Sequence, residues 1–457
     1  MFIHRISRDE FEKQLNTVVS PARPIQSIEH LVWRHDELER IRRALAMTGR
    51  HIFIYGDRGV GKTSLAETAA AQLQSSDAEP VSIACTPQMN FESVIANIVY
   101  KSLRASRLYT TKTTTRTKVN LKALSLELGR DNSLNDITAQ LKSGHDPVEV
   151  LREALSYHSE RPVVVVDEFD RIRELSEREK FGDFVKQLGD RGVDVRIIFT
   201  GVGQSLQDLL GSHGSAIRQL DTILLPTLPW DGRFEIVNKA MAPFGLVIDR
   251  DIVLRIAAIS DGYPSYIHKI TEKMLWCVFN DRAKVREVAW SHFSTALNDS
   301  IAESNAAYSE IYASVVNQRS DDYEEVLWST ADSEYLQRYV SDMFASYEYV
   351  VEQRRKSNPL DQEKYAARIR SLKAKGCGEI LVPVKGKRGM YQYRENMFRG
   401  FVRMQAEAHG IQLVGKAREQ SPAQRIHVPA SAGRGYFVSK LPPGVHTGRK
   451  RKSSGDD

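Results

Sequence analysis

The segment Ile52–Leu65, with the sequence IFIYGDRGVGKTSL, constrains the fold of this chain more than any other stretch. A short apolar run typical of a β-strand leads into Gly56, and Gly56–Thr63 follows the pattern G-x-x-x-x-G-K-[ST] of a phosphate-binding loop. The residues after Thr63 favour a helix, whose positive N-terminal end would face a bound anion. Strand, loop and helix in this order predict a nucleotide site, rather than a glycine-rich turn that contains a lysine by chance.

Each residue type in this loop has a chemical task. Glycines let backbone N–H groups curl around phosphate oxygens without a Cβ in the way. Lys62 can reach the β- and γ-phosphates of ATP, and the Thr63 hydroxyl can ligate Mg²⁺. The nucleotide contacts that we expect in the loop are Gly56, Asp57, Arg58, Gly59, Val60, Gly61, Lys62, Thr63 and Ser64.

A second motif, RPVVVVDEFDRI, follows about a hundred residues later. Its four consecutive valines predict a strand that is buried on both faces of a parallel sheet. Asp167 and Glu168 come at the carboxyl end of this strand, where open α/β sheets place their ligands. We expect Asp167 to hold Mg²⁺ through water, and Glu168 to polarise the water that attacks ATP. The alternative, two carboxylates that merely end a strand, is weakened by the preceding loop.

Two further residues are candidates for the same reaction. Thr200 ends the buried strand Val193–Thr200, a place from which a side chain can sense the γ-phosphate or position water. Arg218 precedes a fifth strand, Thr222–Leu225, and could reach the γ-phosphate of a neighbouring subunit as an arginine finger. A surface arginine at a helix end is an equally good interpretation of Arg218.

Changes in pattern divide the chain into successive parts. We expect an N-terminal arm (residues 1–30), an ATPase core (31–228) with a polar insertion (about 105–145), a helical lid (229–310), a winged-helix-like domain (320–410) and a disordered basic tail (421–457). The predicted fold class is α/β, with a parallel P-loop sheet covered by helices on both faces. Within the insertion, Thr110–Lys118 is polar and lacks periodicity, which indicates a mobile loop.

The C-terminal domain is predicted to carry a basic surface. Residues 354–403 contain 14 Lys and Arg against four Asp and Glu. A helix over Asp361–Lys375, stopped by Gly376, is followed by strands over Glu379–Val384 and Met390–Arg394 with a basic turn between them. This is the plan of a winged helix that binds duplex DNA, and a solvated basic hairpin is the alternative. The expected DNA contacts are Arg368, Arg370, Lys373, Lys385, Lys387 and Arg388.

Composition excludes several other classes of protein. The 457 residues suffice for about three domains, and 41% hydrophobic residues support folded cores. Three distant cysteines indicate a reducing compartment and no zinc site. The N-terminus carries charges where a signal peptide needs an apolar run, and no stretch is apolar enough to span a membrane. We therefore expect a cytoplasmic protein without a membrane partner.

Taken together, these motifs resemble AAA+ ATPases of the initiator clade, the origin-recognition-like and archaeal-type ATPases. GDRGVGKT and VVVVDEFD match their Walker A and Walker B patterns. RHDELERI at Arg34–Ile41 resembles the segment before the P-loop that often packs against adenine, which makes Arg34 a candidate nucleotide contact; Trp33 stands where glycine is common. In this resemblance Thr200 is the sensor-1 residue and Arg218 the arginine finger.

The lid departs from the pattern of that clade. DGYPSYIHK resembles the sensor-2 region but lacks its arginine, so His268 or Lys269 would have to take that place. From the residues alone, a structural histidine is the default interpretation of His268. The G-x-P turn is also similar to that of STAND-type signalling ATPases.

The resemblance implies an ATP-hydrolysing switch that uses ATP and Mg²⁺, acts on duplex DNA and assembles as a homo-oligomer or with a partner ATPase subunit. The alternative is a STAND-like signalling or defence ATPase whose C-terminal domain binds a protein partner. A chaperone-like remodeller is less favoured, because no second P-loop follows the first.

Overall fold

The computed structural model describes most of the chain between residues 3 and 413. The described residues are 3, 6–19, 31–75, 78–106, 117–120, 125–128, 133–203, 219–281, 285–317, 322–355 and 357–413. Arg218 and the expected basic tail (421–457) lie outside these ranges, and both remain predictions. Within the ranges, every helix is too short or too polar to serve as a membrane span.

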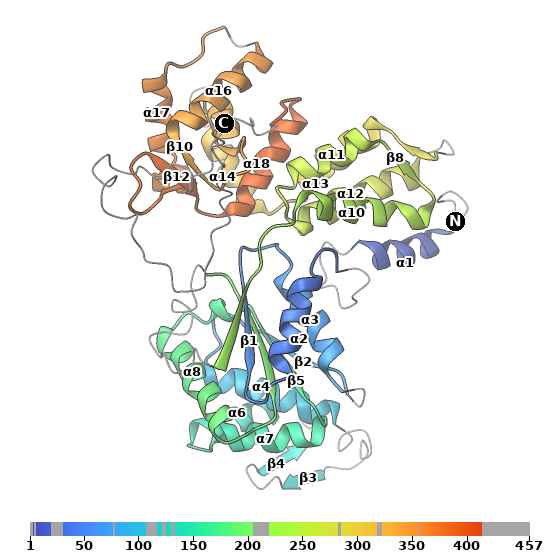
Figure 1. Ribbon diagram of the computed structural model, residues 1–457, viewed down its shortest axis with the longest axis vertical. Coiled ribbons are helices and arrows are strands. Elements are labelled where there is room, and N and C mark those ends of the chain that lie inside the picture. The colour runs from blue at the N-terminus through green and yellow to red at the C-terminus, as the bar shows by residue number, and fades with distance from the viewer. Residues whose placement is uncertain are drawn as a thin grey trace, which may run out of the picture. The chain divides into compact units, whose positions relative to one another are not determined.

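The core of the fold is a sheet of five parallel strands in the order β2-β5-β6-β1-β7 (Figure 1). The strands are β1 (His51–Tyr55), β2 (Val81–Ala84), β5 (Val163–Asp167), β6 (Arg196–Gly201) and β7 (Leu220–Leu224). Because the strands are parallel, their carboxyl ends meet at one edge of the sheet. Since β6 lies between β1 and β5, Thr200 comes between the phosphate loop after β1 and Asp167 at the end of β5.

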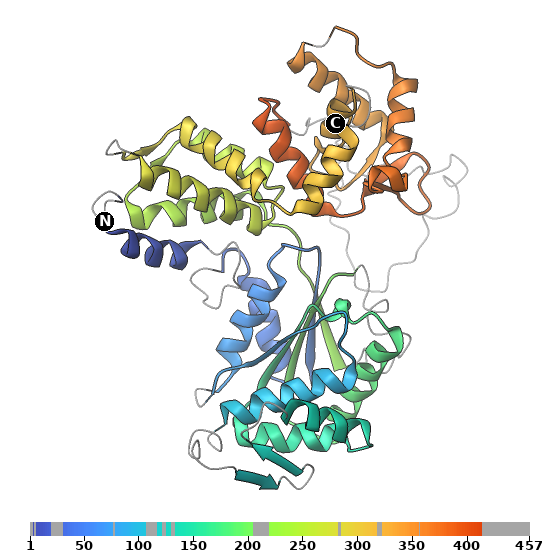
Figure 2. The ribbon, with the colours of Figure 1, turned by 180° about the vertical axis from the view of Figure 1, so that it is seen from behind.

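Each face of the sheet has its own apolar core, and the valine run of β5 supplies both. Val163 and Val165 pack in a cluster with the helices α2 and α3, whereas Val164 and Val166 pack in a second cluster with α4, α7 and α8. The bounds of these helices are α2 (His35–Leu45), α3 (Lys62–Leu73), α4 (Phe91–Ala105), α7 (Pro147–His158) and α8 (Leu175–Asp190). From behind, α4 and its neighbours are seen to cross the second face (Figure 2). This arrangement confirms the predicted P-loop α/β class.

The insertion contains regular structure. The strands β3 (Thr117–Asn120) and β4 (Ser125–Leu128) pair antiparallel, and the helix α6 (Ser133–Lys142) follows. Residues 107–116 of the insertion lie outside the described ranges. The prediction of an irregular loop is wrong for Thr117 and Lys118, because their backbones pair with Leu128 and Glu127.

The next part of the chain is helical, as expected for the lid. Its elements are α10 (Trp230–Met241), η4 (Ala242–Phe244), β8 (Val247–Ile248), α11 (Arg250–Ile259), α12 (Pro264–Asn280), β9 (Glu287–Val288) and α13 (Trp290–Ala302). Asp249 caps α11 by accepting the N–H of Asp251 at 2.8 Å. The N-terminal helix α1 (Arg8–Val18) also packs here, since the ring of Phe11 stacks on Phe279 of α12 with centroids 4.2 Å apart.

The last part of the described chain combines helices with a small antiparallel sheet in the order β10-β12-β11. Its elements are α14 (Ala306–Val316), α15 (Tyr323–Ala331), β10 (Gln337–Tyr339), α16 (Val340–Arg354), α17 (Gln362–Ser371), η5 (Lys375–Cys377), β11 (Leu381–Pro383), β12 (Met390–Tyr393) and α18 (Asn396–Ala408). The expected succession of helix, strand, basic turn and strand is present as α17, β11, residues 384–389 and β12.

Three predicted elements in this part are longer than the observed ones. The strand expected over Glu379–Val384 is β11 (Leu381–Pro383), and the strand expected over Met390–Arg394 ends at Tyr393. The helix α17 ends at Ser371 and does not continue to Lys375. Leu372 is buried, and its carbonyl oxygen accepts the N–H of Leu381 at 3.2 Å. This bond to the start of β11 redirects the chain before Gly376, which lies in the short helix η5.

Candidate functional site

The phosphate loop joins β1 to α3 and makes the close approach that its first glycine predicts. A Cβ on Gly56 would lie 2.4 Å from the carbonyl oxygen of Leu225, which follows β7. Gly61 caps α3 with a left-handed backbone, φ 97°. Since α3 begins at Lys62, the positive N-terminal end of this helix faces an anion held by the loop.

Lys62 lies inside the loop. Its ammonium group donates hydrogen bonds to the carbonyl oxygens of Gly56 at 3.0 Å and Asp57 at 2.7 Å. Burial lowers the pKa of Lys62 to about 8, although the carboxylates of Asp170, Asp167 and Asp57 act in the opposite direction. The lysine is therefore a poorly hydrated cation in a partly closed site, which favours an anionic ligand.

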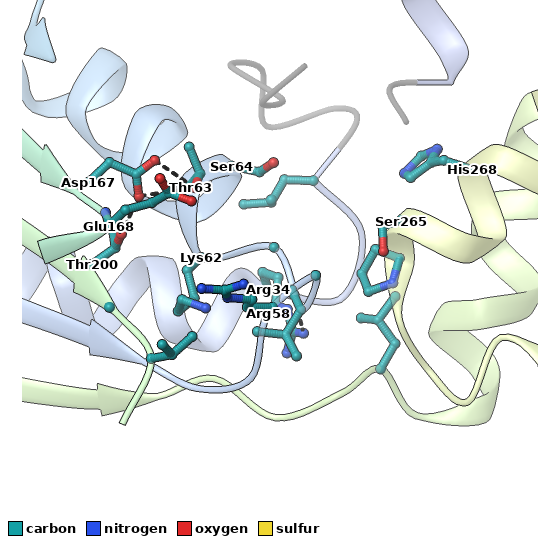
Figure 3. A pocket seen from close by; sticks show the side chains of 18 of the residues that line it. Arg34, Arg58, Lys62, Thr63, Ser64, Asp167, Glu168, Thr200, Ser265 and His268 are labelled. Carbon is teal, nitrogen blue, oxygen red and sulfur yellow. Dashed lines mark hydrogen bonds between the residues drawn. The ribbon is translucent and has the colours of Figure 1, made fainter. Parts of the chain in front are cut away.

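Thr63, Asp167 and Thr200 meet at the edge of the sheet, as Figure 3 shows. The Thr63 hydroxyl lies 3.0 and 2.9 Å from the two carboxylate oxygens of Asp167, and the Thr200 hydroxyl donates a hydrogen bond to the same carboxylate. Asp167 is 8% exposed. These groups come from α3, β5 and β6. The order of the strands thus brings together Thr63 and Thr200, which are 137 positions apart in the sequence.

The donor set of this cluster fits Mg²⁺. Mg²⁺ is bound by oxygen, and it commonly uses one or two protein groups together with waters and substrate phosphates. Thr63 and Asp167 offer a hydroxyl and a carboxylate. Among the described residues, no group of three or more His, Cys, Asp and Glu could form a dedicated metal cage. The site thus fits a metal that arrives with its phosphate ligand.

Glu168 follows Asp167 and has an unusual backbone. Its φ of 52° lies in the left-handed region, which is rare for a residue other than glycine. Its N–H donates to the Thr200 hydroxyl at 3.2 Å, and its carboxylate pairs with Arg171 at 2.7 Å. The Glu168 side chain is 48% exposed, so water can reach it.

Asp170 lines the same cavity, although no role was predicted for it from the sequence. Its carboxylate accepts the N–H of Val202 at 2.8 Å. Its position three residues after Asp167, beyond the end of the strand, was a signal that could have drawn attention to it.

Apolar side chains also line this cavity, whose volume is about 470 Å³. They include Leu31 and Val32 before β1, Leu228 before α10 and Ile236 within α10. Arg34 also lines it; its buried guanidinium donates to the carbonyl oxygens of Val60 at 3.2 Å and Pro226 at 2.6 Å. Trp33 has φ 56°, a left-handed backbone that glycine adopts more readily than other residues.

The lid contributes His268 and Ser265 to the cavity, from the first turns of α12 (Figure 3). Lys269, the alternative candidate for the sensor-2 position, is not part of the lining described for this cavity. Its ammonium group donates to the carbonyl oxygen of Glu303. The structure thus places His268 at the predicted nucleotide site and Lys269 away from it.

Two of the six basic candidates in the C-terminal part have intramolecular partners. Arg368 pairs with Asp322 at 3.0 Å and lies over the ring of Tyr323, whereas Lys373 lies over the ring of Tyr391. The remaining four are exposed, namely Arg370 on α17 and Lys385, Lys387 and Arg388 in the turn between β11 and β12. The turn is therefore the more accessible basic surface.

A comparison with protein families agrees with this geometry. The family model described as the AAA ATPase domain matches residues 30–198, which include both Walker stretches. The matched segment is similar to the AAA ATPase domain, and this likeness to AAA+ ATPases is the one that the motifs predict. The match includes the phosphate loop, Asp167 and Glu168.

Solved structures match most of the chain at low sequence identity. No curated protein matches the chain. A Walker-type ATPase of Pyrococcus abyssi is similar at 17% identity and TM-score 0.47, over 84% of this chain and 99% of that chain. The ORC1 protein of Aeropyrum pernix, solved in complex with DNA, has 16% identity and TM-score 0.41, over 82% and 93%. The RuvB Holliday junction branch migration motor of Thermotoga maritima has 12% identity and TM-score 0.40, over 86% and 99%.

Proposed function

We propose that this protein binds ATP with Mg²⁺ in the cavity between the phosphate loop and the lid, and hydrolyses it. One observation carries the proposal: the Thr63 hydroxyl, the Asp167 carboxylate and the Thr200 hydroxyl converge beside Lys62 at the carboxyl edge of the sheet. Apolar side chains for a base, a cationic loop for phosphates and an oxygen cluster for a metal lie in one cavity.

The loop and the helix α3 hold the phosphates. The ammonium group of Lys62 exchanges its carbonyl acceptors in the loop for oxygens of the β- and γ-phosphates, and the first N–H groups of α3 add further donors. Thr63 and Asp167 hold Mg²⁺, which neutralises charge on the phosphates when it is bound. Leu31 and Leu228 cover the apolar base, while His268 approaches the phosphates from the lid.

Glu168 orients the attacking water. Phosphoryl transfer needs positioning and charge stabilisation more than covalent chemistry, so an exposed carboxylate beside the γ-phosphate suffices. Its ion pair with Arg171 must open or rotate for the carboxylate to reach water. Because exposed pairs contribute only about 0–1 kcal/mol, this rearrangement costs little.

Replacement of Glu168 tests the assignment. Glu168→Gln keeps the shape of the side chain but removes the base, so we expect phosphate release to fall by about 10²-fold or more while the affinity for ATP stays within a few-fold. The matched control is Glu174→Gln, at an exposed carboxylate immediately before α8, which should retain the wild-type rate. Phosphate release by Glu168→Gln at the wild-type rate would make the assignment of the base wrong.

We also propose that the ATPase cycle is coupled to duplex DNA through the C-terminal part. The observation in favour is that α15, β10, α16, α17, β11 and β12 follow one another as in a winged helix, with the exposed basic turn between the last two strands. Lys385, Lys387 and Arg388 then contact backbone phosphates, whereas Arg368 supports the helix through its pair with Asp322.

Charge reversal in the turn tests this coupling. The double variant Lys387→Glu, Arg388→Glu should weaken binding to duplex DNA by about tenfold or more and reduce its salt dependence. The control reverses Arg42 and Arg43, which are exposed on α2, and changes the net charge equally. Equal affinity for duplex DNA in the turn variant and the wild type would show that the turn does not contact DNA. Self-association driven by ATP without DNA would instead favour the STAND-like alternative with a protein partner.

A further inference from the structure

A buried aromatic ring anchors the turn after β5 in the apolar core. Phe169 begins the short helix η2 (Phe169–Arg171) and is 0% exposed. Its ring packs edge-on against Phe181 and Phe199, with centroids 5.0 and 5.3 Å away. Because this anchor lies between Glu168 and Asp170, the two carboxylates on either side of it are directed to the cavity together.

Two hydrogen bonds then join this turn to the end of β6. The N–H of Glu168 donates to the Thr200 hydroxyl at 3.2 Å, and the N–H of Val202 donates to Asp170 Oδ1 at 2.8 Å. The bonds run in opposite directions and lie on either side of the segment 168–170. Together with the hydrogen bond from Thr200 to Asp167, they extend the connection between β5 and β6 beyond the paired strands.

The conformation of Glu168 makes such a restraint necessary. A left-handed backbone at a residue other than glycine is strained and persists only where the surroundings enforce it. The buried ring of Phe169 fixes one side of Glu168. Asp170, the residue after Phe169, is restrained by the bond from the Val202 N–H.

We infer that Asp170 is a positioning residue of the nucleotide site: its hydrogen bond from the Val202 N–H ties the turn after β5 to the end of β6 and keeps Glu168 aimed at the attacking water. This inference rests on the proposed hydrolysis at the site. Asp170 acts through Glu168 and Thr200, and takes no part in binding the metal.

Two variants of Asp170 separate the hydrogen bond from the charge. Asp170→Ala removes both the acceptor and the charge, whereas Asp170→Asn keeps an oxygen that can accept from Val202. We expect kcat for ATP to fall by about tenfold to 10²-fold in Asp170→Ala, with KM within about threefold, because misplacement of a catalytic group acts on the chemical step. Asp170→Asn should retain kcat within about threefold. Asp183→Ala, at an exposed carboxylate of α8, is the control.

Hydrogen exchange of the Val202 amide provides a readout that does not depend on activity. Protection of this amide should fall by about tenfold in Asp170→Ala and stay near the wild-type level in Asp170→Asn. Wild-type kcat in Asp170→Ala would overturn the inference. An equal loss of kcat in both variants would also overturn it, because the effect would then come from the charge of Asp170 and not from its hydrogen bond. An inactive wild-type protein would instead overturn the proposed function, and the exchange of Val202 would still decide whether Asp170 ties the strand ends together.

Discussion

At the scale of single residues, the site depends on charges that are partly removed from water. Lys62 is the clearest example. Its ammonium group lies inside the loop that is proposed to bind the phosphates of ATP. Desolvation destabilises the charged form of a lysine, and a bound phosphate stabilises that form again. The protonation of Lys62 and the binding of ATP are therefore linked.

This linkage predicts a pH dependence of ATP binding. Burial lowers the pKa of Lys62 to about 8, so the free protein carries a charged Lys62 below that pH and a largely neutral one above it. We expect the affinity for Mg–ATP to fall between about pH 7 and about pH 9, and binding near the higher pH to take up a proton. Calorimetry in buffers of different ionisation enthalpy measures the uptake. Lys62→Arg, which stays charged throughout, should bind without it.

The residue scale also shows what sequence reasoning can reach. Lys62, Thr63, Asp167 and Glu168 were predicted because their chemistry is encoded in short, contiguous motifs. The contact between Asp170 and Val202 could not be predicted, because it spans 32 positions and depends on the order of the strands. Arg368 was similarly expected to be free for DNA, since nothing local indicates its pair with Asp322, 46 positions earlier.

At the scale of elements, the loop and the sheet constrain each other. The N–H of Leu225 donates to the carbonyl oxygen of Tyr55 at 2.8 Å, which brings the chain after β7 against the start of the phosphate loop. Gly56 lies at that contact. Apolar runs in the sequence largely predicted the bounds of the strands. The early end of α17 could not be predicted in this way, because it depends on a hydrogen bond to β11 and not on local helix propensity.

Replacement of Gly56 should disturb this junction. The Cβ of Gly56→Ala would lie 2.4 Å from the Leu225 carbonyl oxygen, so β1 and the chain after β7 must separate. We expect a loss of about 1–3 kcal/mol in the free energy of unfolding, measured with denaturant, together with weaker ATP binding. Gly144→Ala meets no neighbouring atom and tests the strain of a left-handed backbone alone, so it should leave ATP affinity unchanged. Unchanged stability in Gly56→Ala would contradict this expectation, because it would show that β1 and the chain after β7 can separate without a loss of free energy.

At the scale of the whole molecule, a buried ionic cluster joins the turn before α12 to α18. Asp261 accepts hydrogen bonds from Arg399 at 2.6 Å through both carboxylate oxygens, and Arg403 lies 3.6 Å away. All three side chains are at most 6% exposed. Burial alone would raise the pKa of Asp261, but the arginine charges hold it below its ordinary value. Charges this deeply buried are stable only while each retains its partner.

Removal of Asp261 should therefore cost more than removal of a surface carboxylate. Asp261→Ala leaves two guanidinium groups buried without their counter-charge, and we expect a loss of about 3–5 kcal/mol in the free energy of unfolding. The double variant Asp261→Ala, Arg399→Met should lose less than the sum of the two single variants, which a double-mutant cycle measures. Additive losses would contradict a direct coupling between the two residues.

The central claim is that this cavity binds ATP and that Glu168 hydrolyses it. The most direct measurement is the chemical identity of the nucleotide that stays bound after the protein is mixed with Mg–ATP and separated from free nucleotide. The account predicts ADP on the wild-type protein, ATP on Glu168→Gln and no nucleotide on Lys62→Ala. ADP on Glu168→Gln in the wild-type proportion, or no nucleotide on any of the three proteins, would contradict it.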